Sequence, residues 1–329
     1  MKHTQIAVLL AAAVAVSTAS GAFAQGTAAA YPAKPLRFVI PFSPGGTPDL
    51  QLRILDERLT QRLGQPLVHD YRPGAAGNIG MEIVARAPAD GYTLIIATVG
   101  TWAVNPHLYA LPYDVLNDFA PIIHVATTPA VLVVHPSVPA RTVQELIALA
   151  RKRPGELNYG STGVGGFGHM CAELFSAMTQ TRMTHISYKG SAPALADLLG
   201  GHIQVLFNSA VVTVPQIADG RLRALATTGA TRLSILPDVP TVAEAGVPGY
   251  ENSTWTGIAA PARTPAAIIA RLNQEFAAAL ALPEVRERYA ASGSAVTGGT
   301  PEHFRAYLKA ELEKFGKLIR QAGIKPVAG

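Results

Sequence analysis

The chain has 329 residues, a formal net charge of +5 and a single cysteine, Cys171. One cysteine excludes an intramolecular disulfide, so folding must depend on the burial of apolar side chains. The positive charge is dispersed apart from one dense run at 151–153, which ends a predicted helix, so we expect no nucleic-acid partner. The length is enough for two domains.

A secretory signal peptide is predicted over residues 1–24. Met1-Lys2-His3 is a short basic start, an apolar run covers 6–16, and Ala22-Phe23-Ala24 fits the pattern before a cleavage site. The alternative is a membrane anchor, but the apolar run is shorter than the ~20 residues that a spanning helix needs. A secreted chain without a disulfide suits a bacterial periplasm better than an animal extracellular space, so we expect a periplasmic protein.

Strands and helices alternate in the first part of the chain. Thr47 is expected to cap a helix that runs to the break at Gly64, with the φ of Pro48 already set for the helix. A second helix is predicted at 78–87, and strands are predicted at 36–41, 67–71 and 92–98. This order predicts a parallel sheet with helices on both faces.

The same alternation returns in the second part. Thr142 and Glu145 form a capping box that opens a helix ending at Arg153. Further helices are predicted at 169–178 and 191–199, with strands at 130–135, 157–160, 184–188, 203–207 and 222–227. Residues 237–250 are rich in proline and glycine and are expected to connect this part to a strand at 255–260 and two amphipathic helices, 265–280 and 301–319.

We therefore predict an α/β fold of two lobes. The first lobe would comprise residues 31–127 plus 248–329, and the second residues 128–247, because the chain is expected to return to where it started. Two crossings between the lobes would form a hinge.

Two glycine-rich loops are the main candidates for a binding site. PFSPGGTPD (41–49) and YGSTGVGGFGH (159–169) each connect the end of a predicted strand to the start of a helix. Glycines let the backbone approach a ligand, and helix N-termini supply free N–H groups and partial positive charge, so such loops can hold an anion without arginine. The alternative is that both are ordinary tight turns.

Asp49 favours a carboxylate over a phosphate as that anion. A carboxylate in the first turn of a helix takes up part of the same positive potential. We expect Asp49 to bind loop or helix amides, or else to meet a cationic group on the ligand.

Catalysis and cofactor binding find less support. Residues 163–168 match the dinucleotide fingerprint but lack an acidic residue ~20 positions further on. Ser161 lacks the first glycine of a nucleophile elbow, and His169 and Cys171 fall on different faces of a helix. We therefore predict no enzymatic activity, no cofactor and no metal site.

Trp102, after the strand at 92–98, is expected to pack within a lobe or the hinge, or alternatively to stack on an aromatic acid.

Several ordered motifs resemble one family. The two glycine loops, Tyr188-Lys189-Gly190, the DLLGG run at 197–201, LPDVPTVAEAGVPGYE and WTGIAAPARTP are similar to the substrate-binding receptors of tripartite tricarboxylate transporters, also called Bug receptors. The resemblance runs from about Tyr31 to the C-terminus. It implies a Venus-flytrap periplasmic binding protein of type II, a small carboxylate ligand (a dicarboxylate, tricarboxylate or aromatic acid), the transporter's membrane subunits as partners and a monomeric state. The alternative is a periplasmic hydrolase on a related fold, with Ser161 as nucleophile.

The resemblance also implies the residues of the binding site. Gly166 stands where the family often has serine or threonine, and Asn208 stands where it often has aspartate, which removes a partner for a ligand ammonium group. The implied ligand-binding residues are Phe42, Ser43, Gly45, Gly46, Asp49, Thr98, Thr101, Trp102, Ser161, Thr162, Gly165, Gly166, His169, Tyr188 and Asn208.

Overall fold

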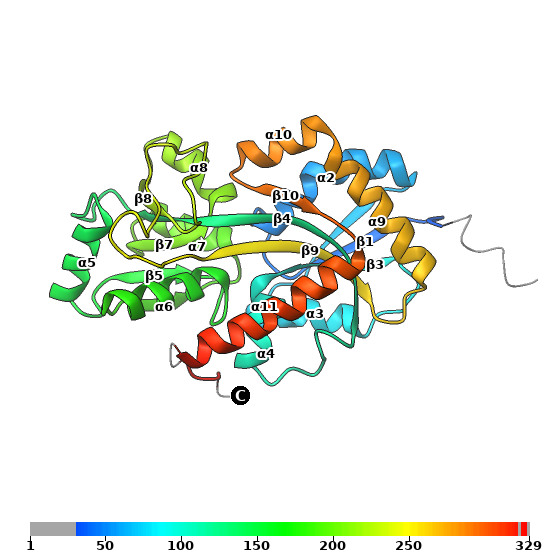
Figure 1. Cartoon of the computed structure of the whole chain (residues 1–329), viewed down its shortest axis with the longest axis horizontal. Coiled ribbons are helices and arrows are strands. Elements are labelled where there is room, and N and C mark those ends of the chain that lie inside the picture. The colour runs from blue at the N-terminus through cyan, green and yellow to red at the C-terminus, as the bar shows by residue number, and fades with distance from the viewer. Residues whose placement is uncertain (1–30, 322–323, 328–329) are drawn as a thin grey trace, which may run out of the picture.

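Two long strands join the two halves of the molecule. The computed structural model describes residues 31–321 and 324–327, so the predicted signal peptide lies outside the described residues. Strands β4 (Phe119–Val134) and β9 (Ser253–Pro261) are paired antiparallel and run side by side from one half to the other (Figure 1). The strand order of the whole sheet is β2-β1-β3-β9-β4-β7-β5-β6, with β8 and β10 also paired to β4.

Each half contains its own parallel strands. In the first half β1 pairs in parallel with β2 and β3, as predicted, and in the second half β5 pairs in parallel with β6 and β7. Strands β3, β7, β8 and β10 meet β4 or β9 in antiparallel orientation, so the complete sheet is mixed. The bounds are β1 Leu36–Ile40, β2 Leu67–Tyr71, β3 Thr93–Thr98, β5 Asn158–Ser161, β6 Thr184–Ser187, β7 Val205–Ser209, β8 Arg223–Thr227 and β10 Ala295–Gly298.

Helices cover both faces of the sheet (Figure 1). In the first half they are α2 Thr47–Leu63, α3 Asn78–Ala85, α4 Asn105–Leu108, α9 Ala266–Ala281, α10 Pro283–Ala291 and α11 Pro301–Gln321, with a 3₁₀ turn η1 at Ala75–Gly77 and a π-helical turn η2 at Gly100–Val104. In the second half they are α5 Val143–Lys152, α6 Phe167–Thr179, α7 Ser191–Leu199 and α8 Ala210–Ala218. None of the helices within 31–321 and 324–327 combines the length and apolar character that crossing a membrane requires.

The buried apolar side chains form separate cores in the two halves. One cluster draws only on residues 31–126 and 258–289, and two others draw only on residues 130–250. A fourth cluster belongs to the first half, around Trp102 and Phe304, but also contains Met170 from α6 of the second half. Each half therefore has its own hydrophobic core, and α6 of the second half also packs against the core of the first half.

Most of the predicted elements are confirmed, including the capping box of α5, where Thr142 Oγ1 accepts a hydrogen bond from the Glu145 amide at 3.1 Å. The predicted strand at 130–135 proved to be only the second half of β4. Pro121 and Pro129 hide the first half, because proline removes a donor from the ladder and is typical of turns. The sheet accommodates this strand with shifts of register at 121–123 and 124–126.

Thr47 does not cap α2, contrary to the prediction. The N-cap is Gly46, and Thr47 is already the first helical residue. Its hydroxyl oxygen is buried and has no hydrogen-bond partner within the protein. The Thr47 hydroxyl, which the sequence predicted to cap the helix, therefore makes no hydrogen bond within the protein.

Candidate functional site

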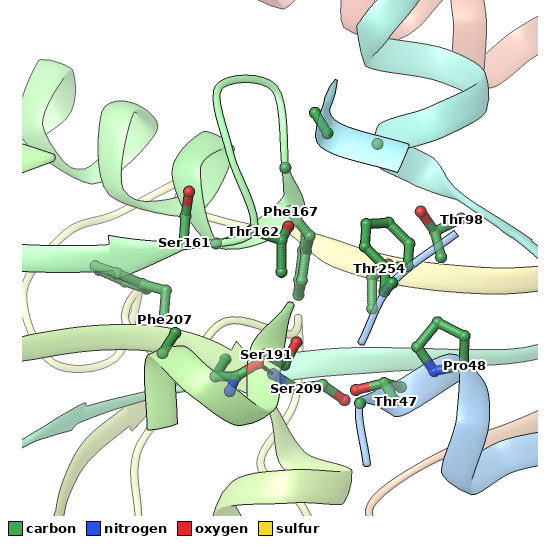
Figure 2. A pocket seen from close by; sticks show the side chains of 18 of the residues that line it. Thr47, Pro48, Thr98, Ser161, Thr162, Phe167, Ser191, Phe207, Ser209 and Thr254 are labelled. Atoms are coloured by element: carbon green, nitrogen blue, oxygen red, sulfur yellow. Dashed lines mark hydrogen bonds between the residues drawn. The ribbon is translucent and has the colours of Figure 1, made fainter. Parts of the chain in front are cut away.

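A pocket lies between the two halves, at the carboxyl ends of β1, β3, β5 and β7. This is the edge where open α/β sheets bind ligands. The pocket and its opening together contain about 680 Å³ of space that no protein atom fills, which includes open solvent. Figure 2 shows Thr47, Pro48 and Thr98 of the first half opposite Ser161, Thr162, Phe167 and Phe207 of the second, with Thr254 of β9 between them.

The two glycine loops have the same backbone design. Gly45 and Gly165 adopt φ of +76° and +82°, a left-handed conformation that favours glycine. Each is followed by an extended N-cap glycine, Gly46 before α2 and Gly166 before α6. Neither helix receives a side-chain cap, so the first-turn N–H groups of both, apart from Pro48, which has none, have no capping partner at the pocket wall.

The pocket wall brings helix N-termini together but contains no charged side chain in the part of the chain that the structure describes. None of the described residues that line it is an aspartate, glutamate, lysine, arginine or histidine. Helices α7 and α8 also begin at the pocket, with Ser191 and Ser209 in its wall, and neither has a side-chain cap. Aligned helix N-termini favour a bound anion.

Asp49 lies behind the first loop and shapes it. Only 2% of its side chain is exposed, and its carboxylate accepts hydrogen bonds from the Gly45 amide and the Tyr71 hydroxyl, both at 2.8 Å, and from Arg53 at 3.0 Å. Burial alone would raise the pKa of Asp49, but these hydrogen bonds outweigh it and hold the pKa below its usual value. Asp49 binds a loop amide, which was the first of the two roles predicted for it.

His69 completes this network from β2. Its Nδ1 lies 3.2 Å from the Asp49 carboxylate and its Nε2 lies 2.9 Å from Asp56. The hydrogen bond to Asp56 is the main reason that the pKa of His69 is raised, with Asp49 adding to the shift against the effect of burial.

A group of neutral side chains supports the second loop. The Gly165 amide donates to His169 Nδ1 at 3.3 Å, and the His169 ring lies 4.6 Å from the His185 ring. Burial lowers the pKa of both histidines to about 4, and in His185 the neighbouring His169 adds to the effect. At neutral pH, His169 therefore serves as an uncharged acceptor for the loop.

Most of the chain matches a known protein family. Residues 51–324 match the family described as "Tripartite tricarboxylate transporter family receptor". The chain belongs to this family. The family consists of solute-binding receptors of a periplasmic binding protein fold rather than enzymes, which agrees with the predicted fold and function.

Several individual proteins are similar to the receptor along nearly its whole length. Protein BugT of Bordetella pertussis is 37% identical over 308 residues, which cover 93% of this chain and 94% of that protein. The structure of R. palustris Rpa4515 with adipate is 40% identical, covers 90% of this chain and 100% of that one, and has a TM-score of 0.88. MatC from Rhodopseudomonas palustris, with bound malate, is 28% identical, covers 88% of this chain and 100% of that one, and has a TM-score of 0.84.

The predicted site residues of the receptor divide into two groups. Those that line the pocket are Phe42, Gly46, Thr98, Ser161, Thr162, Gly166 and Asn208. Those that lie behind or beside its wall are Ser43, Gly45, Asp49, Thr101, Trp102, Gly165, His169 and Tyr188.

The second group makes contacts within the protein. Trp102 is fully buried in the first-half core, with its ring centroid 5.3 Å from that of Phe119, which favours lobe packing over a stacking face. Tyr188 donates its hydroxyl hydrogen to Asp197 at 2.7 Å. The Ser43 amide donates to the Lys189 carbonyl at 3.3 Å, across the two halves.

Ser161 is engaged by its own loop. Its hydroxyl donates to the Gly163 carbonyl at 2.9 Å and accepts from the Gly163 amide at 3.1 Å, while His185 Nε2 lies 2.6 Å away. Two of the hydrogen bonds of Ser161 thus fix the turn that precedes α6. This arrangement suits a structural hydroxyl better than the hydrolase nucleophile considered as an alternative.

Sequence reasoning missed part of the pocket wall. Helix α8 was not predicted, because its sequence AVVTVPQIA is rich in β-branched residues and contains Pro215, so its start at Ser209 was overlooked. The residues missed as lining are Thr47, Pro48, Ala76, Gly100, Phe167, Gly168, Ser191, Ala194, Leu206, Phe207, Ser209, Thr254 and Thr256. The alternation of Thr254 and Thr256 on β9 was a usable signal, since residues two apart face the same side of a strand.

Proposed function

We propose that the receptor captures a small carboxylate in this pocket and delivers it to the membrane subunits of a tripartite tricarboxylate transporter. One observation carries the proposal. The free N-termini of α2 and α6 come from opposite halves and line one pocket whose described wall contains no charged side chain. Main-chain N–H groups and helix dipoles would bind the carboxylate from both sides.

The apolar part of the wall constrains the rest of the ligand. Phe42, Phe167 and Phe207 line the pocket, and these rings suit an aliphatic chain or an aromatic ring. The related structures with adipate and malate support a dicarboxylate, and a tricarboxylate or an aromatic acid remains in the proposed class.

Binding would be coupled to closure of two lobes. We place the first lobe at residues 31–127 plus 248–329 and the second at 128–247, with β4 and β9 as the hinge. Contacts across the cleft, such as the Tyr109 hydroxyl donating to the Val164 carbonyl at 2.7 Å, would hold the closed form. A ligand that touches both lobes favours that form. The mature protein would act as a monomer in the periplasm after loss of residues 1–24.

The test is a thermal-shift panel of aliphatic dicarboxylates, tricarboxylates, aromatic acids and amino acids. A ligand raises the melting temperature by mass action, and a receptor leaves it chemically unchanged. At least one carboxylate is expected to stabilise the wild type. The proposal fails if none does, or if the acid that binds is converted to a product.

The variant Gly46→Val tests where the acid binds. Gly46 has an ordinary φ of −79°, and a Cβ there lies no closer than 3.5 Å to its neighbours, so the variant should fold. The valine methyl groups would block approach to the α2 amides and weaken binding by about tenfold or more, since the hydrogen bonds to the carboxylate would be lost.

Gly200→Val is the matched control. Gly200 has a φ of −80° and similar space around its Cβ position, but it lies at the far end of α7. This variant should bind the acid as the wild type does. Undiminished affinity in Gly46→Val would contradict the placement of the site.

A further inference from the structure

A second cavity lies in the first half, away from the pocket between the two halves. It is lined by the starts of α9 and α11 and by Ala120 and Pro121 of β4. Both helices begin toward the end of the first half that is farther from the second half (Figure 1). With its opening to solvent, the cavity contains about 920 Å³ of space that no protein atom fills. Ala120 pairs with Ala260 of β9, six residues beyond Thr254 of the receptor pocket, so the two sites lie roughly 20 Å apart along this strand.

The start of α9 has no anion of its own, in contrast to the start of α11. In α11, Glu302 is the second helical residue, and its pKa is lowered chiefly by a hydrogen bond from its own backbone amide, with Thr300 adding to the shift. In α9 the N-cap is Pro265, which makes no side-chain cap, and the first turn contains no acidic residue. The first-turn N–H groups of α9 therefore have no capping partner, and their partial positive charge has no anion to balance it.

A buried hydroxyl beside the start of α9 also lacks a partner. Thr264 immediately precedes the N-cap, is only 6% exposed and lines the cavity. Its amide donates to the Pro261 carbonyl at 3.0 Å, but its hydroxyl oxygen has no hydrogen-bond partner among the described residues. Buried polar atoms nearly always have partners, and the cavity is the side from which one can still approach. The hydroxyl thus points to a ligand group independently of the helix.

The rest of the wall defines the chemistry of that ligand. Arg305 is held by hydrogen bonds to the carbonyls of Leu116 at 3.1 Å and Phe119 at 3.5 Å, and it forms no ion pair with a carboxylate within 31–321 and 324–327. Ile269 adds an apolar surface. Because Glu302 already places one negative charge in the wall, the cavity suits a ligand with a single negative charge and a small apolar body.

We propose that this cavity is a second binding site, which takes a small monocarboxylate. The carboxylate would accept hydrogen bonds from the first-turn amides of α9 and from the Thr264 hydroxyl, and Arg305 would add its positive charge. The apolar part of the ligand would lie against Ile269. The cavity and the receptor pocket share no lining residue, so this site stands or falls independently of the proposed function.

Titration of the labelled protein with acetate and with hexanoate, followed by backbone amide NMR, tests the site directly. At least one of these acids should shift the signals of Thr264, Ala266 and Ala267 along a saturable curve. Hexan-1-ol has the same chain length as hexanoate without the charge and should not do so, because helix N-termini favour anions. The absence of a saturable shift with either acid overturns the site, and so does an equal shift with hexan-1-ol.

The variant Ala267→Glu gives α9 a carboxylate at its second helical residue, the position that Glu302 holds in α11. The new carboxylate should bind the α9 amides itself and weaken monocarboxylate binding in the cavity by about tenfold or more. An acid in the first turn stabilises a helix, so the loss cannot be attributed to unfolding. Ala267→Gln, which is similar in size but uncharged, is the control and should keep the wild-type affinity within about threefold. Wild-type affinity in Ala267→Glu would contradict binding at this helix start.

The variant Thr264→Val tests the buried hydroxyl. It should not lower the urea midpoint, because the hydroxyl has no partner within the described residues to lose. It should weaken monocarboxylate binding in the cavity by about threefold or more, since one hydrogen bond to a charged group is removed. A lower urea midpoint with unchanged binding would show that the hydroxyl is structural and would overturn its place in the site.

Discussion

Asp49 fixes the backbone of the first glycine loop without forming part of the pocket wall. Its carboxylate accepts the Gly45 amide at the residue with a left-handed backbone, and this contact sets the direction of the following N-cap glycine. Because the pKa of Asp49 is lowered, the side chain is ionised at neutral pH. The ionised Asp49 carboxylate holds the loop in the conformation that leaves the N-terminus of α2 facing the pocket.

The variant Asp49→Asn should lose both stability and affinity. Asparagine keeps one acceptor oxygen, so its NH₂ group would face either the Gly45 amide or the Tyr71 and Arg53 donors, at a cost of about 1–3 kcal/mol in the free energy of unfolding. Urea unfolding and titration with the bound acid would measure the two losses. Asp238→Asn, at an exposed position, is the control and should change neither. Wild-type affinity in Asp49→Asn would show that the loop does not need this carboxylate.

Helix α2 is tied to both hinge strands through Gln51, one turn beyond the pocket. Gln51 is fully buried and donates from Nε2 to Thr128 of β4 at 3.1 Å and to Ser294 at 3.2 Å. Its Oε1 accepts from Thr256 of β9 at 2.5 Å. The side chain thus joins a ligand-facing helix to the two strands that cross between the halves.

Replacing Gln51 with leucine should destabilise the protein by about 1–3 kcal/mol, since the hydroxyls of Thr128, Thr256 and Ser294 would lose buried partners. The free energy of unfolding in urea is the measurement. Gln61→Leu is a matched control on the same helix, because Gln61 is exposed, and it should change stability by less than about 0.5 kcal/mol. Equal effects of the two substitutions would contradict a specific role for Gln51.

At the scale of elements, the sequence predicts best where local rules and tertiary structure agree. The parallel strands β1–β3 and the capped helix α5 follow periodicity and capping patterns that act within a few residues. The length of β4 and the existence of α8 depend on sheet pairing, which overrides the local preferences of proline and β-branched residues.

The site shows the same division between local and tertiary information. The two loops were recognisable because glycine marks unusual backbone geometry in the sequence itself. Which side chains reach the pocket could not be read in this way. Trp102 follows the end of β3 and Thr254 lies near the start of β9, yet Trp102 packs in the core and Thr254 lines the pocket.

At the scale of the whole molecule, buried histidines make stability depend on pH. His124, His169 and His185 have pKa values lowered to about 4, with burial as the main cause in each. These groups take up protons more readily in the unfolded chain, whose histidines titrate near 6.5. The free energy of unfolding should therefore fall as the pH drops from about 6.5 to about 4, by at most roughly 3 kcal/mol for each histidine.

Two other groups modify this profile. The lowered pKa of Asp49 adds a further loss of stability as the pH falls through the acid range. The raised pKa of His69 adds stability that is fully present below the ordinary histidine pKa and is lost as the pH rises through the raised value. Urea unfolding at pH 7, 5.5 and 4 measures the net effect. Stability that is unchanged between pH 7 and pH 4 would contradict the assignment of the three histidines as buried and neutral.

The crystal structure of the receptor with the tightest-binding acid of the panel tests the central claim most directly. We predict one carboxylate between the first turns of α2 and α6, within hydrogen-bond distance of main-chain N–H groups or of waters held by them, from both lobes. An acid bound outside this pocket, or held by one lobe alone, would contradict the account.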